Sequence, residues 1–284
     1  MKNLSDINVI KSVMQKHGVT FNKGLGQNFL VDSEVCPSMA EAAELDENTC
    51  VIEIGPGVGV LTAELAKRAG KVLSFEVDNR LLPVLKETLA DFDNVEIINE
   101  DVMKANLPQI IDEKCKGMDI AVCANLPYYI TSPIIMLLLE SRLPIKSITV
   151  MVQKEAADRL CAEVGSRDGG AVTVAVSYYA DSEELFFVPR ESFLPPPKVN
   201  SEVIKLTVRE KPPVEVENEE FFFKLVKAAF SQRRKTAENS ISAGLGVAKS
   251  EVAEALAKAG LEKTIRAEKL TMQNFADIAK ILNK

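Results

Sequence analysis

The chain has 284 residues, of which 46% are hydrophobic and 26% charged, values ordinary for a soluble globular protein. It contains no run of about 18 apolar residues, and its N-terminus lacks the apolar core and cleavage site of a secretory signal, so we expect no membrane span and a cytoplasmic location. The net charge of −7 argues mildly against a nucleic-acid partner unless a local basic patch outweighs it.

Cysteine and histidine usage argues against a metal site. The five cysteines are scattered and include no Cys-x-x-Cys pair, so we expect buried, reduced thiols. They are Cys36, Cys50, Cys115, Cys123 and Cys161. His17 is the only histidine, which leaves almost nothing for a zinc site or a Ser-His-Asp triad, and we expect no metal.

Strands and helices alternate along the first half of the chain. The N-terminal stretch is helical in pattern, and a polar, glycine-bearing segment at 23–32 follows it. Strands are predicted at 50–54, 71–76, 95–98, 119–124 and 147–152. Helices are predicted at 60–67, 80–91, 133–140 and 154–163. This alternation predicts an α/β fold with a doubly wound, mostly parallel sheet.

The pattern changes in the second half. The segments 171–179, 184–189 and 201–208 are strand-like with no helix between them, so we expect antiparallel strands to close the sheet. The proline- and acid-rich segment 211–220 is typical of a linker. Helical segments follow at 219–232, 236–244, 249–260 and 269–284. We therefore predict a large domain at 1–210, with an N-terminal helical extension, and a small helical domain at 211–284.

The ends of the predicted strands carry the candidate ligand groups. The first strand runs into EIGPGVG, whose glycines Gly55 and Gly57 let the backbone approach a ligand closely. The next two strands lead to Glu76 and Asp101. A glycine turn followed by an acid suits an adenosine-bearing cofactor, because the acid accepts hydrogen bonds from the ribose hydroxyls. The G-x-G-x-G spacing and the second acid, placed for the adenine amino group, favour S-adenosylmethionine over a pyrophosphate-bearing cofactor.

The fourth strand ends in NLPYYITSP, which contains no acid, base or thiol. Methyl transfer from a sulfonium needs no strong acid, but an adenine amino group must be made nucleophilic. The Asn125 side chain and a carbonyl at Leu126 or Pro127 could hold its two N–H bonds and favour a pyramidal nitrogen. Tyr128 could stack on the base, a contact worth roughly 1–3 kcal/mol. Such a base must leave any helical stack.

A purely structural interpretation stays open for each motif. Gly55, Gly57 and Gly59 could merely form a tight turn, and Glu76 could be a solvated strand end. The tetrapeptide Asn-Leu-Pro-Tyr at 125–128 could be a turn shaped by proline, with a core tyrosine.

The series GLGQNFL, EIGPGVGVLT, FEVD, NEDV, NLPYYITSP, FLPPPKVNS and FSQRRKT resembles the KsgA-type small-subunit rRNA adenine dimethyltransferases. The resemblance spans nearly the whole chain and implies a Rossmann-like methyltransferase domain with a small all-helical C-terminal domain that binds rRNA. The implied reaction makes N6,N6-dimethyladenosine at two adjacent adenosines near the 3′ end of 16S rRNA, with S-adenosylmethionine as the donor.

The family's contacts carry over onto this sequence residue by residue. The implied cofactor contacts are Asn28, Leu30, Gly55, Glu76, Asp101 and Asn125, with Gln27 close by. The target adenine would lie against Tyr128, with Phe193 as a second aromatic wall, although Phe193 could also be a core residue before a polyproline turn. Tyr129 departs from many relatives, which carry a smaller polar residue there, and this could alter the pocket rim.

The expected partner is 16S rRNA within the 30S subunit or its precursor, bound by a monomer with no membrane contact. The QRRKT element places Arg233, Arg234 and Lys235 together, with Lys224 and Lys227 on the preceding predicted helix. This cluster is the local basic patch that the acidic net charge requires for phosphate binding.

Three alternatives remain. A 23S rRNA adenine methyltransferase of the erythromycin-resistance type shares the fold and a similar tetrapeptide, but QRRKT and FLPPPK favour the small-subunit family. A non-catalytic RNA-binding assembly factor would not need the intact Gly55, Glu76, Asp101 and Asn125. A nicotinamide dehydrogenase is disfavoured by the glycine spacing and by the position of His17 upstream of the fold.

Overall fold

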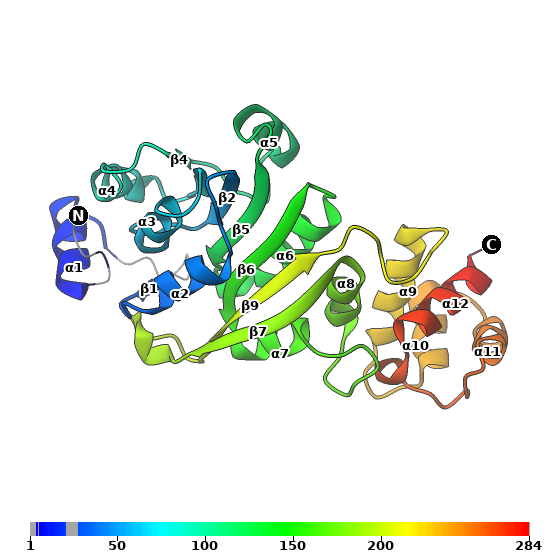
Figure 1. Ribbon diagram of the computed structural model, residues 1–284. Helices are drawn as coiled ribbons and strands as arrows, with labels where there is room; N and C mark the ends of the chain where they lie inside the picture. The colour runs from blue at the N-terminus through cyan, green and yellow to red at the C-terminus, as the bar shows by residue number, and fades with distance from the viewer. Residues whose placement is uncertain (1–3, 5, 21–27, 284) are drawn as a thin grey trace. The chain divides into compact units, whose positions relative to one another are not determined.

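The computed structural model describes all of the chain except residues 1–3, 5, 21–27 and 284 (Figure 1). It divides into two compact units, one made of Met1–Ala157 with Ser182–Val208 and the other of Asp158–Asp181 with Arg209–Lys284. The predicted boundary at 210 lies close to the second division point, whereas the inclusion of 158–181 in the second unit was not expected. The assignment of domains and of their functions stays a proposal.

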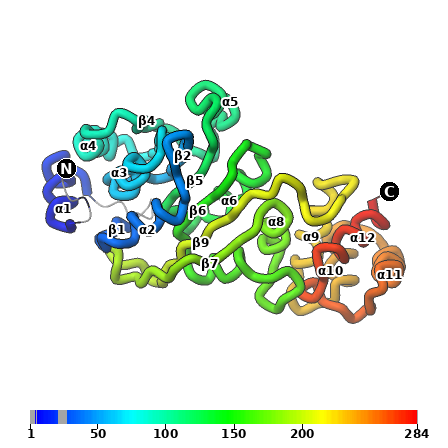
Figure 2. Tube along the Cα trace, in the orientation of Figure 1, coloured from blue at the N-terminus to red at the C-terminus, as the bar shows by residue number. Residues whose placement is uncertain are grey.

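The first unit is built on a seven-stranded sheet in the order β4-β3-β2-β5-β6-β9-β7. Figure 2 shows β2, β5, β6 and β9 side by side, although they are far apart in sequence. The strands are β2 (Thr49–Ile54), β3 (Lys71–Phe75), β4 (Val95–Ile98), β5 (Asp119–Asn125), β6 (Ile145–Gln153), β7 (Ala180–Val188) and β9 (Ser201–Val208).

The predicted parallel sheet is confirmed, and so is an antiparallel closing strand at 201–208, whereas 171–179 is not a strand. The neighbours from β4 to β6 are parallel, and β9 pairs antiparallel with β6. All six residues of β2 are buried, as expected for a central parallel strand covered on both faces. The order reverses between β2 and β5, so the carboxyl ends of these strands flank the switch point where open α/β sheets bind ligands.

Helices cover the sheet on both faces (Figure 1). They are α2 (Val35–Ala42), α3 (Val60–Ala66), α4 (Leu82–Thr88), α5 (Leu107–Lys114), α6 (Thr131–Glu140) and α7 (Lys154–Leu160). Helix α1 (Ile7–Lys16) is capped by the Asp6 side chain, which accepts from the amide of Asn8, and it buries Ile10, Val13 and Met14 on one face.

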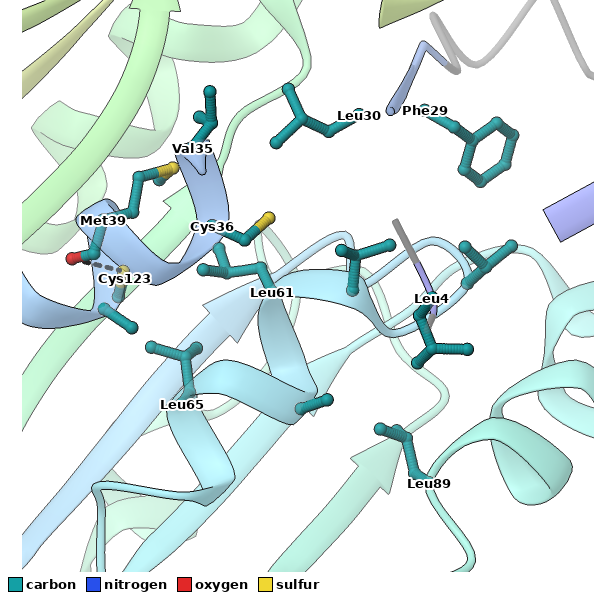
Figure 3. Close-up of a cluster of buried hydrophobic side chains, with 14 of the residues drawn as sticks. Leu4, Phe29, Leu30, Val35, Cys36, Met39, Leu61, Leu65, Leu89 and Cys123 are labelled. Carbon is teal, nitrogen blue, oxygen red and sulfur yellow. Dashed lines mark hydrogen bonds between the residues drawn. The ribbon is translucent and has the colours of Figure 1, made fainter. Parts of the chain in front are cut away.

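The apolar side chains of α1, α2, α3 and α4 form one core with the strands beneath them. Figure 3 shows Met39 and Cys36 of α2 facing Leu61 and Leu65 of α3, with Leu89 at the far side. This core fixes the elements on either side of the glycine turn, so it also fixes the turn itself.

A two-stranded ribbon joins distant parts of the sequence. Strand β1 (Phe29–Leu30) pairs antiparallel with β8 (Phe193–Leu194), with Leu30 opposite Phe193. The amide of Val31 donates to the Ser192 carbonyl at 2.9 Å and extends the pairing. The ribbon therefore brings the glycine-bearing N-terminal segment beside the FLPPPK segment.

Among the described residues of the second unit, the first two residues of β7 are in a strand and the other regular elements are helices. One of these helices was predicted as a strand. Residues Ala171–Tyr179, predicted as a strand, form helix α8. The other helices are α9 (Glu219–Phe230), α10 (Ala237–Leu245), α11 (Lys249–Lys258) and α12 (Met272–Leu282), in agreement with the predicted segments. Tyr178 and Tyr179 of α8 pack on Phe222 and Phe223 of α9, and this packing is the physical reason for the helix.

The expectation of five reduced cysteines is also wrong. Cys50 at the start of β2 and Cys115 after α5 form a disulfide, because the fold brings their Cα atoms to 5.8 Å across a sequence separation of 65. Cys36 and Cys123 are buried and free. No helix among the described residues has the length and apolarity that crossing a bilayer requires.

Candidate functional site

A cavity of about 400 Å³ lies in the first unit at the carboxyl ends of the strands. Its walls come from the turn after β2, the ends of β3 and β4, the NLPY segment after β5 and the β1–β8 ribbon. The volume is in the range of small-molecule sites. Strand register explains the convergence, because Ile54 pairs with Phe75 and Phe75 with Ile98, so these strands end at one level.

The cavity brings together every candidate cofactor and catalytic residue that the structure describes. They are Asn28, Leu30, Gly55, Gly57, Glu76, Asp101, Asn125, Leu126, Pro127, Tyr128 and Phe193. Gln27 lies outside the described residues. Arg233, Arg234 and Lys235 belong to the second unit, in the connection between α9 and α10, where all three are exposed.

The glycine turn is held against Glu76. Gly57 has φ +60°, and a Cβ there would stand 3.2 Å from Cε1 of Phe29, so any side chain would be strained and crowded. The Gly55 amide donates to the Phe75 carbonyl at 2.9 Å. The amides of Gly57, Val77 and Asp78 all donate to the Glu76 carboxyl, which is thereby oriented at the end of β3.

Two buried carboxyl groups have raised pKa values. Burial raises the pKa of Glu76 above its usual range, although the backbone amides that donate to it act in the opposite direction. Burial also raises the pKa of Glu53 to about 7, against hydrogen bonds from Ser74 and Thr62. Glu53 lines the cavity beneath the turn and is a site residue that the sequence reading missed. Its one signal in the sequence is its place as an acid two residues before Gly55, where the glycine turn begins.

The cavity's charge favours a cation. Glu53, Glu76, Glu100 and Asp101 lie among the lining residues, whereas no lysine, arginine or histidine does among those that the structure describes. A pyrophosphate would meet this acidic wall without any compensating cation, whereas a positively charged sulfonium or ammonium would be attracted to it. The described residues also contain no group of three or more side chains suited to hold a metal ion.

The NLPY segment turns sharply at the mouth of the cavity. The Pro127 carbonyl accepts from the Ile130 amide at 3.1 Å and from the Thr131 hydroxyl at 3.3 Å, so both of its lone pairs serve the turn. The Leu126 carbonyl makes no such bond within the described part of the chain. The Leu126 carbonyl, and not that of Pro127, can therefore accept a hydrogen bond from a ligand N–H beside Asn125.

Two aromatic rings face the cavity near that point. Phe193 is 3% exposed and lines the cavity from β8, and Tyr128 lines it from the short 3₁₀ turn Tyr128–Ile130. The Tyr128 hydroxyl lies 2.6 Å from Oγ of Ser201. Burial raises the pKa of Tyr128, so the phenol stays protonated near neutral pH. Tyr129 is 63% exposed and forms part of the rim.

Comparisons with known proteins agree on one family. Residues 18–284 match the family described as Ribosomal RNA adenine dimethylase. The Ribosomal RNA small subunit methyltransferase A of Shouchella clausii is 48% identical, over 95% of this chain and 93% of that protein. The protein of the same name from Alkaliphilus oremlandii is 46% identical, over 100% of this chain and 99% of its own length.

Two solved structures are similar over most of the chain. A dimethyladenosine transferase from Plasmodium falciparum is 26% identical with a TM-score of 0.75, covering 90% of this chain and 97% of that one. The 23S rRNA methyltransferase ErmE is 30% identical with a TM-score of 0.69, covering 90% of this chain and 100% of that one. The strand-end cavity, the matched family and the identity over nearly the full length agree, and the chain belongs to the ribosomal RNA adenine dimethylase family.

Proposed function

We propose that this protein transfers methyl groups from S-adenosylmethionine to the N6 atoms of two adjacent adenosines near the 3′ end of 16S rRNA. The observation that carries the proposal is the convergence of Glu76, Asp101, Asn125 and Tyr128 on one acidic cavity. Relatives that are 45–49% identical over nearly the whole chain are small subunit methyltransferases. These features support an enzyme that acts on the 30S particle in the cytoplasm, and we take it to work as a monomer.

The donor's place follows from the charged and glycine-lined part of the cavity. Glu76 would accept from the ribose hydroxyls and Asp101 from the adenine amino group, while the turn at Gly55 and Gly57 leaves room for close backbone approach. Asn28 and Leu30 close the same region from the β1–β8 ribbon. The donor supplies a methyl group on a positively charged sulfur. The acidic wall fits that charge.

The acceptor's place follows from the uncharged part of the cavity, at the NLPY segment. The Asn125 side-chain oxygen and the Leu126 carbonyl would accept the two N–H bonds of an adenine amino group. A nitrogen held in this way keeps its lone pair directed at the donor, and such placement accounts for much of the rate in a reaction of this type. Tyr128 and Phe193 would stack on the base, which must be flipped out of its stack to enter. When the methyl group bonds to N6, its bond to sulfur would break and the donor would leave as a neutral thioether. Because Tyr128 is protonated and Asn125 is neutral, the proton that N6 loses would pass to water.

The RNA backbone would be held by the second unit. Arg233, Arg234 and Lys235 are exposed, and none forms an ion pair with a described residue. Lys224 and Lys227 are exposed on the preceding helix α9. Five cations within twelve residues provide a local phosphate-binding surface despite the net charge of −7.

A substrate test separates the small-subunit activity from its nearest alternative. The similarity to ErmE shows that the fold alone does not choose between 16S and 23S rRNA. Purified protein and S-adenosylmethionine would be incubated with 30S particles or with naked 23S rRNA, and the nucleosides analysed by mass spectrometry. We expect dimethyladenosine in the 30S particles only. Activity confined to 23S rRNA would contradict the proposal.

The acceptor mechanism is tested by Asn125→Ala. Because the amide acts mainly on the acceptor, we expect kcat to fall by about 100-fold or more, while the affinity for S-adenosylmethionine in calorimetry changes little. Asn48→Ala is the matched control, since Asn48 is exposed and outside the cavity. Turnover like that of the wild type in Asn125→Ala would refute the mechanism.

A further inference from the structure

The hydroxyl of Tyr128 is already engaged by the protein. It lies 2.6 Å from the Ser201 hydroxyl, 73 residues further along the chain, and the bond joins the NLPY turn to β9, the strand between β6 and the edge strand β7. Stacking on a base uses only the face of an aromatic ring, so phenylalanine would stack equally well. The hydroxyl therefore needs another explanation, and Ser201 supplies one.

Ser201 is held rigidly. It is fully buried, it is the first residue of β9, and it stands opposite Gln153 in the antiparallel pairing with β6. The residue before it is fixed as well, because the Asn200 carbonyl accepts from the Lys154 amide at 3.0 Å and its side chain accepts from the Arg190 amide at 3.1 Å. The Ser201 hydroxyl is thus a fixed point beside the cavity.

Tyr128 is held less firmly by its own surroundings. It belongs to a three-residue 3₁₀ turn whose N-cap, Pro127, provides no side-chain hydrogen bond. Its ring is half-buried, with one side along the cavity. The direction of the ring's long axis depends on the first side-chain torsion, which can vary unless the far end of the ring is anchored. The hydroxyl oxygen lies on the axis of the second torsion, so a short, directional hydrogen bond there fixes the direction of the ring's long axis.

We propose that Ser201 is a positioning residue that fixes the direction of the Tyr128 ring's long axis and so places the ring for stacking on the acceptor base. The inference rests on the proposed function, since it assumes that a base enters beside Tyr128. Ser201 touches neither substrate nor donor and acts only through the Tyr128 hydroxyl. Its loss therefore affects the acceptor side of the reaction and leaves donor binding intact.

A double-mutant cycle tests this role. Ser201→Ala and Tyr128→Phe each remove the same hydrogen bond, so each should lower kcat/KM for 30S particles by about three- to tenfold. The double variant should be no worse than either single variant, because the bond can be lost only once. Calorimetry should give the wild-type affinity for S-adenosylmethionine in all three. Ser141→Ala is the control, since the Ser141 hydroxyl donates to the Leu138 carbonyl at the end of α6 and the residue does not line the cavity.

A spectroscopic readout separates positioning from a general loss of structure. The chain has four tyrosines, so 3-fluorotyrosine labelling gives a small set of fluorine signals, and Tyr128→Phe identifies the signal of interest. Ser201→Ala should shift or broaden that signal alone. Additive losses in the cycle, or single variants that match the wild type, would overturn the proposal. A wild-type protein that methylates no 30S particles would instead overturn the proposed function itself.

Discussion

Glu53 is buried in the first unit, and one of its carboxylate oxygens accepts hydrogen bonds from two neighbouring elements. Its Oε2 accepts from the Thr62 hydroxyl of α3 at 2.7 Å and from the Ser74 hydroxyl of β3 at 2.5 Å. The carboxyl therefore ties β2, α3 and β3 together directly below the glycine turn. Burial and the neighbouring Glu76 disfavour its charged form, and these effects outweigh the two hydrogen bonds.

This raised pKa predicts that stability falls as the pH rises. The pKa of Glu53 is about 7 in the folded protein against an ordinary 4.5, so between these values the folded state binds more protons than the unfolded state. The free energy of unfolding should decrease across this window by about 3 kcal/mol and level off above pH 7. Glu53→Gln keeps both hydrogen-bond acceptor contacts and removes the titration.

Urea denaturation of both proteins between pH 4.5 and 8 measures the effect. Relative to the wild type, Glu53→Gln should gain stability as the pH rises. Only the wild type must protonate this side chain on folding or, above pH 7, bury its charge. The difference between the two curves isolates Glu53 from other titrating groups. Parallel curves would show that Glu53 titrates with an ordinary pKa.

At the residue scale, the sequence predicts some residues of the site and not others. The positions of Glu76, Asp101 and Asn125 are predictable, because each lies at the end of a strand or within three residues after it, and parallel strands end at one edge. Glu53 lies inside a strand, and nothing in the pattern indicates that Thr62 and Ser74 would face it. The bond between Tyr128 and Ser201 depends on pairing between distant strands, so it too required the structure.

At the scale of elements, the glycine turn is the part that a single methyl group would disturb. Gly57→Ala forces a side chain into a left-handed backbone conformation, which costs about 1–2 kcal/mol, and presses Cβ against Phe29. The shift would also move the amide that donates to Glu76. We expect a stability loss of that size and an affinity for S-adenosylmethionine that is weaker by about tenfold or more.

Gly117→Ala provides the matched control. Gly117 also has a positive φ, of +80°, but a Cβ there would meet nothing within 4 Å and the residue lies outside the cavity. Thermal unfolding should show a comparable loss for both variants, whereas calorimetry should show weakened donor binding for Gly57→Ala alone. Equal donor affinity in the two variants would mean that the turn does not contact the donor.

Helix α8 shows how packing overrides local preference. The run AVTVAVSYY contains β-branched residues in near alternation, which is the pattern of a strand. In the structure, the Thr173 hydroxyl accepts from the Gly170 amide at 2.9 Å and closes the N-terminus of a helix. The hydroxyls of Tyr178 and Tyr179 both donate to Glu219 of α9. These partners lie about 40 residues away, so a local window could not reveal them.

At the scale of the whole molecule, charge is divided unequally between the site and the proposed RNA surface. The cavity in the first unit is acidic, whereas the connection between α9 and α10 in the second unit carries three adjacent exposed cations. An acidic cavity attracts a cationic donor and repels phosphate. An enzyme on RNA with this cavity must therefore obtain its affinity for the RNA backbone from residues outside the site.

The variant Arg233→Gln, Arg234→Gln, Lys235→Gln tests this division. Each lost phosphate contact reduces the salt dependence of RNA binding by roughly one unit in the log–log slope. We expect KM for 30S particles to rise by about tenfold or more, with kcat at saturation and the affinity for S-adenosylmethionine close to wild type. Methylation rates measured at several salt concentrations provide the slope.

A second triple variant controls for net charge. Lys11→Gln, Lys116→Gln and Lys146→Gln remove the same three charges from exposed positions of the first unit. If binding depended only on the total charge, both triple variants would weaken it equally. Because phosphate binding releases counterions only where cations gather, we expect the control to keep the wild-type slope of RNA binding against salt. An equal loss of binding in both triple variants would show that the RNA surface does not lie at the α9–α10 connection.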